Sequence, residues 1–238
     1  MDLDGNLIVN LNSEHPEALA AFYRDTIGLK PNPAIGEWAF MAATTPFVID
    51  GHSELKGQTK EPPRPIFNFS TDDVHVEQAR LESLGVRFLG PPTPDPISFA
   101  TFVDPDGNYG QIFSMEGAPL GLEMFALSRS SEDPERMRSF YRDVVGLSDD
   151  FPELGSPFMA GETSMYVSPH SETHGQAKEP ARVLLNLPVA DLAAEQKRLA
   201  GLGVTFLRSA GREAWGGFIS TFQDPDGDYL QLVEYRPA

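Results

Sequence analysis

The chain of 238 residues contains no cysteine, little positive charge and no long uncharged apolar stretch. Without cysteine it has no disulfide bond, no thiolate metal site and no cysteine nucleophile. Lys and Arg number 18 against 35 Asp and Glu, which gives a formal net charge of −17. Such an acidic surface repels nucleic acid and anionic lipid, so we expect neither as a partner. No segment approaches the roughly 18 apolar residues that a transmembrane helix needs.

The N-terminal segment has neither a positively charged start nor an apolar stretch after it, so no secretory signal is visible. We therefore expect a cytoplasmic protein. Hydrophobic residues make up 40% of the chain and charged residues 22%. This composition is typical of a globular protein with a substantial core rather than a disordered chain.

The sequence contains a tandem duplication. The motif Phe22-Tyr23-Arg24-Asp25 returns 118 positions later as Phe140-Tyr141-Arg142-Asp143. After a two-residue insertion, Asp104-Pro105-Asp106-Gly107 returns 120 positions later as Asp224-Pro225-Asp226-Gly227. Repeats of this length are characteristic of duplicated domains. We predict two domains built to one plan, at residues 1–117 and 118–238.

Each copy has the pattern strand, helix, strands, and then the same pattern again. In the first copy, Pro16 suits the first turn of a helix and Gly28 suits its end. Asp73 begins a second helix that Gly85 ends, and Asp-Pro-Asp-Gly predicts a turn before the last strand. Strands are predicted at 7–12, 38–42, 46–49, 66–70, 86–89, 99–103 and 109–113. The fold class is therefore α+β, with four βαβββ-like units.

These motifs together resemble the vicinal-oxygen-chelate superfamily, which contains glyoxalases, extradiol dioxygenases, and bleomycin- and fosfomycin-resistance proteins. The resemblance covers nearly the whole chain. It implies paired βαβββ units whose mixed sheets curl into a U-shaped cleft. In the enzymes of the superfamily the cleft holds a divalent metal through His, Gln and Glu, whereas other members bind ligands without a metal. The residues that carry the resemblance are Pro16, Phe22–Asp25, Gly28-Leu29, Asp73, Arg80-Leu81, Leu84–Val86, Phe88, Phe102 and Asp104–Asn108, with counterparts in the second copy.

The resemblance also locates the positions of the usual metal ligands. They fall on Ile8, Val48, Ile66 and Gln111 in the first copy, and on Ala126, Tyr166, Leu184 and Gln231 in the second. Aliphatic side chains have no lone pair to offer, and a single amide is a weak neutral donor for a divalent ion. We therefore expect the usual metal site to be absent from both copies, and no cofactor.

A relocated metal site is the alternative. His170, Glu172 and His174 alternate along the chain, and on a strand they would share one face. Against this, the segment is a polar loop, and the first copy has Lys56 in place of His174. A repeated His-Ser-Glu, here also at 52–54, more often anchors a loop through side-chain-to-backbone hydrogen bonds.

Two repeated charged pairs lie in the loops that follow. Lys60-Glu61 returns as Lys178-Glu179 between prolines and polar residues. We expect them to form solvated ion pairs on the surface, which contribute little stability.

Without a metal, the cleft would still present polar side chains. Strand alternation places Asn and Ser residues two positions beyond the former ligand positions, on the same face. Such neutral groups either orient a ligand or pair with each other and tie the strands together. Tyr166 and Trp215 are aromatic candidates for stacking on a planar ligand, and both favour the second copy as the working site. The candidate ligand-binding residues are Asn10, Asn68, Gln111, Ser128, Tyr166, Asn186, Trp215 and Gln231.

The favoured hypothesis is a bleomycin-resistance-like protein that binds a small organic molecule without a metal. The alternative is a metal-dependent lyase, isomerase or dioxygenase that uses His170, Glu172 and His174. The sequence therefore leaves open whether the protein is an enzyme. It is equally compatible with a monomer, whose two copies pair internally, and with a homodimer.

Overall fold

The computed structural model describes the chain except residues 2, 95, 150–156 and 236–238. The first copy consists of two units, each a helix with strands. The elements of unit 1 are β1 (Ile8–Ser13), α1 (Pro16–Ala21), the π-helical turn η1 (Phe22–Ile27), β2 (Lys30–Pro31), β3 (Ala39–Ala42) and β4 (Thr45–Gly51). Those of unit 2 are β5 (Pro65–Ser70), α2 (Val74–Ser83), β6 (Arg87–Phe88), β7 (Ile97–Val103) and β8 (Tyr109–Met115).

The second copy repeats this order. The elements of unit 3 are β9 (Phe125–Ser130), α3 (Pro134–Ser139), η2 (Phe140–Val145), β10 (Phe158–Ala160) and β11 (Thr163–Ser168). Those of unit 4 are β12 (Val183–Pro188), α4 (Leu192–Gly201), β13 (Phe206–Arg212), β14 (Phe218–Gln223) and β15 (Tyr229–Glu234). The predicted α+β fold with four such units is thus confirmed. None of the helices in the described part of the chain is long and apolar enough to cross a membrane.

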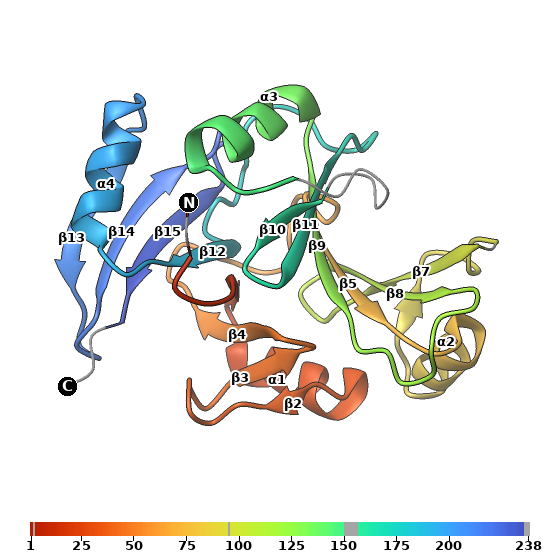
Figure 1. The fold of residues 1–238 in the computed structure, drawn as a ribbon. Coiled ribbons are helices and arrows are strands. Elements are labelled where there is room, and N and C mark those ends of the chain that lie inside the picture. Colours follow the sequence, from red (N-terminus) through yellow and green to blue (C-terminus); the bar gives the residue numbers. More distant parts are fainter. Residues whose placement is uncertain (2, 95, 150–156, 236–238) are drawn as a thin grey trace.

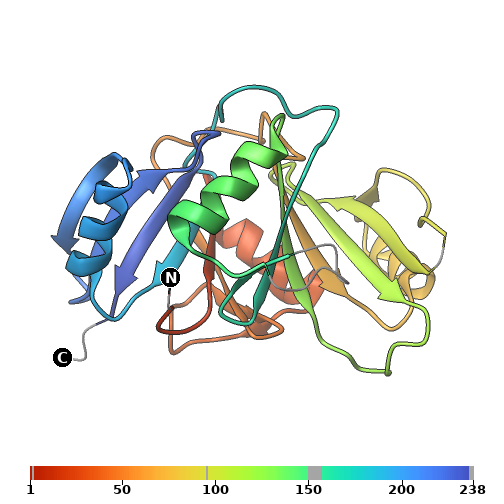
Figure 2. The ribbon, with the colours of Figure 1, turned by 45° about the horizontal axis from the view of Figure 1, so that its top comes forward.

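Each sheet combines one unit of the first copy with one unit of the second copy (Figures 1 and 2). The first sheet has eight strands in the order β13-β14-β15-β12-β1-β4-β3-β2, so unit 1 pairs with unit 4. The second has seven strands in the order β10-β11-β9-β5-β8-β7-β6, so unit 2 pairs with unit 3. The antiparallel pairs β1–β12 and β5–β9 join the copies. Each curled sheet therefore contains residues of both halves of the chain.

The helices begin and end at the residues that the sequence predicts. Pro16 occupies the first turn of α1, and Gly28 ends η1 with a left-handed φ of 89°. Gly146 ends η2 in the same way, with φ 84°. The Asp73 carboxylate caps α2 by accepting the N–H groups of His75 and Val76.

The predicted turns before β8 and β15 are anchored from within. Asp104 accepts the N–H groups of Asp106 and Asn108 at 2.9 and 2.8 Å. Tyr23 is a buried residue of η1, and its hydroxyl donates to the other Asp104 oxygen at 3.1 Å. Tyr141 and Asp224 repeat this contact at 3.1 Å. In each copy, a hydrogen bond thus joins the tyrosine of the Phe-Tyr-Arg-Asp motif to the first aspartate of the Asp-Pro-Asp-Gly motif.

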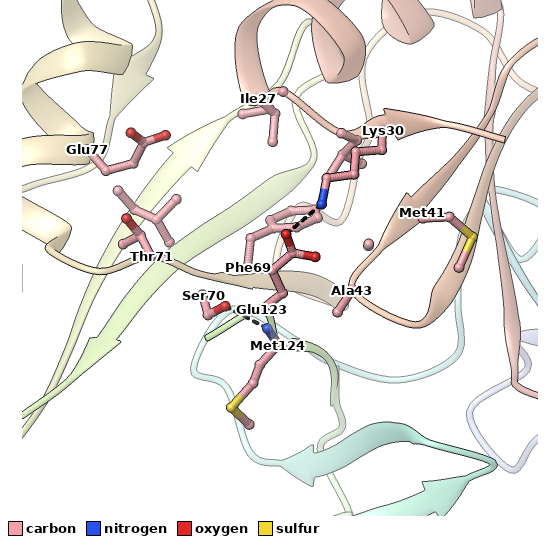
Figure 3. A pocket seen from close by; sticks show the side chains of 14 residues that line it. Ile27, Lys30, Met41, Ala43, Phe69, Ser70, Thr71, Glu77, Glu123 and Met124 are labelled. Carbon is pink, nitrogen blue, oxygen red and sulfur yellow. Dashed lines mark hydrogen bonds and ion pairs between the residues drawn. The ribbon is translucent and has the colours of Figure 1, made fainter. Parts of the chain in front are cut away.

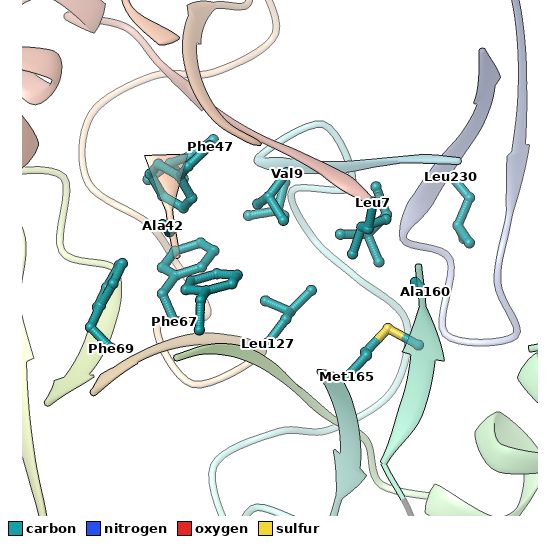
Figure 4. Close-up of a cluster of buried hydrophobic side chains, with 14 of the residues drawn as sticks. Leu7, Val9, Ala42, Phe47, Phe67, Phe69, Leu127, Ala160, Met165 and Leu230 are labelled. Atoms are coloured by element: carbon teal, nitrogen blue, oxygen red, sulfur yellow. The ribbon is translucent and has the colours of Figure 1, made fainter. Parts of the chain in front are cut away.

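The two sheets pack against each other through a single buried apolar cluster (Figure 4). Leu7, Val9 and Phe47 come from the first sheet, and Phe67 and Leu127 from the second. All five are at most 1% exposed. Alternate residues of the same strands point to the opposite face of each sheet, which is where the candidate ligand-binding residues lie.

The lysines and glutamates of these loops differ in exposure: Lys60 and Lys178 are exposed, whereas the side chains of Glu61 and Glu179 are only 10% and 6% exposed. The expectation of solvated surface pairs is therefore wrong for the glutamates. Glu61 accepts the backbone N–H of Lys178 at 2.5 Å, and Glu179 accepts that of Lys60 at 2.7 Å. Each glutamate also holds the arginine three residues on, and the Arg64 side chain is only 2% exposed. The glutamates are buried because each copy's loop packs against the other copy, so the two loops hold each other through Glu61 and Glu179.

Candidate functional site

The candidate residues divide between two equivalent faces. We call face one the side of β4, β1, β12 and β15 that points away from the core cluster, and face two the equivalent side of β11, β9, β5 and β8. The strand registers place each set side by side. Face one carries Ile8, Asn10, Val48, Leu184, Asn186 and Gln231. Face two carries Ile66, Asn68, Gln111, Ala126, Ser128 and Tyr166.

The positions expected to hold metal ligands come together on these faces, but their side chains do not suit a metal. Face one offers Ile8, Val48 and Leu184, which have no donor atom, beside the single amide of Gln231. Face two offers a phenol and an amide among aliphatic groups. Within the described ranges, no three His, Asp or Glu side chains lie in a group that could hold a metal ion. The residues present therefore do not fit the metal that the resemblance implies.

On face two, the amides hold the strands together. Asn68 donates from Nδ2 to the Ser128 hydroxyl and to the Ala126 carbonyl, both at 3.0 Å, across the β5–β9 junction. Gln111 donates from Nε2 to the Thr101 hydroxyl at 2.9 Å. The amide nitrogens are thus engaged within the protein, as one of the two interpretations of the sequence expects.

Face one repeats the arrangement with one substitution. Asn186 donates to the side-chain oxygen of Asn10 at 3.1 Å, where face two has a serine. Gln231 donates to the Thr221 hydroxyl at 3.1 Å. Thr101 and Thr221 were not among the predicted residues. The repeat could have identified them, because a threonine lies ten positions before the glutamine in both copies.

The amide oxygens remain available to a ligand. In the part of the chain that the structure describes, the side-chain oxygens of Asn68, Gln111, Asn186 and Gln231 accept no hydrogen bond. Both glutamines are half-buried, so they retain access to solvent. Each face therefore presents hydrogen-bond acceptors within an otherwise apolar surround.

The two aromatic candidates lie on different sheets. Tyr166 is on β11 in the second sheet, where burial raises the pKa of its hydroxyl. Trp215 lies between β13 and β14 in the first sheet, and its ring is 5.3 Å from that of Tyr235. The sheets exchange units between the copies, so neither face is formed by the second copy alone. Tyr166 lies on face two, whereas Trp215 lies in the β13–β14 loop, outside the strands that define face one.

The repeated His-Ser-Glu segments form turns. The backbone N–H of Glu172 donates to Nδ1 of His170 at 3.2 Å, and Glu54 donates to His52 at 3.3 Å. Residues 169–175 are not part of a strand, so the alternation that would bring His170, Glu172 and His174 to one face does not apply. The matched hydrogen bonds identify the segment as a loop anchor.

The buried charges lie beside the turns that lead into the two glutamine-bearing strands. Arg129 is 1% exposed and is ion-paired with Asp228 and, at 3.5 Å, with Asp224. Burial raises the pKa of Asp228 to about 7, although the Arg129 charge opposes this shift. Burial also raises the pKa of Asp104 to about 6. In the first copy the positions of Arg129 and Asp228 are occupied by Leu11 and Asn108, a difference that removes the charge pair.

The comparisons with known proteins agree with this architecture. The model of the Glyoxalase/Bleomycin resistance protein/Dioxygenase superfamily matches residues 7–112, and that of a Glyoxalase-like domain matches residues 125–233. The structure is similar to that of glyoxalase I from Zea mays, with a TM-score of 0.66 at 18% identity over 97% of this chain and 92% of that one. It is also similar to a putative dioxygenase from Bacillus subtilis subsp. subtilis str. 168, with a TM-score of 0.62 at 13% identity over 100% and 87% of the two chains. No curated protein matches the sequence. At these identities, the likeness to solved structures establishes the fold.

Proposed function

Because the chain belongs to the vicinal-oxygen-chelate superfamily in its tandem two-domain form, we propose that it binds a small organic molecule on face one or face two without a metal ion. The observation that carries this proposal is the set of side chains at the former metal positions. Aliphatic groups occupy three of the four positions on face one, beside Gln231. These side chains suit contact with an apolar ligand better than coordination of an ion.

The amide oxygens indicate the chemistry of the ligand. A molecule that carries N–H or O–H groups can donate to Gln111 or Gln231 while its apolar part contacts the neighbouring aliphatic side chains. Such contacts orient a ligand without charge. The net charge of −17 further disfavours anionic ligands.

The test is a thermal-shift screen of small planar and aromatic metabolites in the presence of a strong chelator. A ligand at about 100 times its Kd should stabilise the folded chain by about 2.7 kcal/mol. The variants Gln111→Met and Gln231→Met retain side-chain length but remove the acceptor oxygen. We expect one of them to weaken a confirmed ligand about three- to tenfold, which corresponds to one hydrogen bond.

The two variants control for each other, because they alter equivalent positions on different faces. Affinity lost in one and retained in the other would assign the ligand to one face. Binding or glyoxalase activity that requires an added divalent metal would overturn the proposal. So would a ligand whose affinity neither variant changes.

A further inference from the structure

A cavity of about 260 Å³ lies between β2 and β3 at the edge of the first sheet and the end of β5 in the second sheet (Figure 3). Its walls come from the end of η1, the β3–β4 turn, the end of β5, α2 and the linker between the copies. Phe69, which lines it, points toward the core cluster rather than toward face two. The cavity is therefore a separate place in the fold, unrelated to the former metal positions.

The equivalent place in the second copy is filled by the protein's own N-terminal segment. Gly28, which lines the cavity, corresponds to Gly146, whose carbonyl accepts a hydrogen bond from the backbone nitrogen of Met1. A Cβ built on Gly146 would lie 2.7 Å from that nitrogen, whereas one built on Gly28 would have nothing within 4 Å. Ala43, also in the lining, corresponds to Gly161, where a Cβ would lie 2.7 Å from the Cα of Asn6.

The linker explains why the first copy keeps the space open. Ser70 donates its backbone N–H to the Met124 carbonyl at 3.0 Å, and its hydroxyl contacts the Leu122 carbonyl at 2.7 Å and the Met124 N–H at 2.6 Å. These bonds hold the linker at the end of β5. The corresponding residue in the second copy is Pro188, which has neither N–H nor hydroxyl, and its carbonyl instead accepts the N–H of Asp4 at 2.9 Å.

The N-terminal segment in the second copy therefore indicates what a ligand in the open cavity would look like. It has an N–H donor that binds the glycine carbonyl, followed by apolar side chains. Met1 and Leu3 pack against the core cluster in the filled copy. In the open copy, Ile27, Phe69 and Met124 supply an equivalent apolar lining (Figure 3).

The charges in the open cavity favour a cation. Its lining includes Glu77 and Glu123 against the single positive charge of Lys30. The Lys30–Glu123 pair spans 2.6 Å, but the two side chains are 73% and 63% exposed. Such an exposed pair is weak, so Glu123 can exchange Lys30 for a positively charged ligand.

We propose that this cavity binds a primary amine with a short apolar chain, whose ammonium group donates to the Gly28 carbonyl and faces Glu123. The apolar chain then lies against Ile27 and Phe69. This proposal does not depend on the one made for faces one and two, because the cavity shares no residue with either face.

The duplication supplies an internal control for the test. In the full-length protein labelled with ¹³C at the methionine methyl groups, n-hexylamine is titrated at neutral pH. The Met124 signal should shift on binding, whereas that of Met159, a methionine of β10 in the filled copy, should not. The uncharged n-hexanol should bind more weakly, because it lacks the ammonium group.

Glu123→Gln should weaken n-hexylamine about threefold, as expected for one exposed charge interaction. Glu213→Gln removes a half-buried glutamate paired with Arg208 in the other sheet, and should leave the affinity unchanged. The proposal is overturned if Met124 does not shift, if Met124 and Met159 shift alike, or if n-hexanol binds as tightly as the amine.

Discussion

The pair Arg129–Asp228 provides the sharpest prediction about stability, because the chain contains its own uncharged counterpart. Arg129 and Asp228 are 1% and 6% exposed, and the arginine's Nε and Nη1 have no hydrogen-bond partner. At the corresponding positions of the first copy, Leu11 and Asn108 are 0% and 1% exposed. The same structural setting therefore accepts either a buried ion pair or an uncharged pair.

The single variant Arg129→Leu leaves Asp224 and Asp228 without their main counter-charge. Removing one partner of a buried pair costs about 3–5 kcal/mol, because the remaining charge is buried without compensation. The double variant Arg129→Leu with Asp228→Asn reproduces the first copy and removes both charges. Replacing a buried pair as a whole is often neutral or stabilising. We expect the double variant to lie within about 1 kcal/mol of the wild type, or above it.

Urea unfolding at pH 8 followed by circular dichroism measures the difference. At that pH Asp228, with a pKa of about 7, is mostly charged in the wild type. If the double variant is as unstable as Arg129→Leu, the charge pair is not interchangeable with the uncharged one, and the account of this cluster is wrong. A single variant as stable as the wild type would refute it equally.

Three further predictions concern the pH dependence of Asp228, the buried arginine Arg64 and the aromatic ring of Trp215. Burial raises the pKa of Asp228 to about 7, above its unfolded value, so its contribution to stability is present at low pH and is lost as the pH rises through the folded pKa. The unfolding free energy of Asp228→Asn, measured relative to the wild type, should therefore rise between about pH 5 and pH 8, and a flat difference would contradict the shift. Arg64→Ala should cost about 3–5 kcal/mol, because Arg64 is buried against Glu61. Arg136→Ala removes the half-exposed partner of Asp226 and should lower the unfolding free energy by under about 1 kcal/mol in the same urea titration. Equal losses of stability in Arg64→Ala and Arg136→Ala would show that burial of the arginine does not decide the loss. Trp215→Ala should lower stability by no more than about 1.5 kcal/mol in calorimetry, since the exposed ring contacts mainly another ring, and a larger loss would mean that the ring is part of the core.

Local patterns predicted the elements and the two faces well. Alternation placed Asn68 and Gln111 on one side of their strands, as it did Asn186 and Gln231, and the registers of β5–β8 and β12–β15 bring each pair side by side. Asp73 begins a helix as its side chain predicts. These outcomes depend on residues that are close in sequence or repeated at a constant spacing, so a single sequence contains the necessary information.

Local sequence patterns could not predict which units pair to form a sheet. Nothing in the sequence around β1 or β12 specifies that these strands join, although the pair decides that Tyr166 and Trp215 lie on different sheets. The burial of Glu61 has the same origin, since its environment is formed by the loop of the other copy. The cavity beside Gly28 depends on the path of the linker, which the bonds of Ser70 determine.

The claim that the protein binds its ligand without a metal is tested most directly by its metal content. The wild type is dialysed against Zn²⁺, Ni²⁺ or Mn²⁺, freed of unbound ions and analysed by inductively coupled plasma mass spectrometry. A variant with Ile8→His, Leu184→His and Gln231→Glu restores ligating side chains on face one and serves as the positive control. We predict stoichiometric metal in the variant and far less than one ion per chain in the wild type. A wild-type protein that retains about one divalent ion per chain would contradict the account.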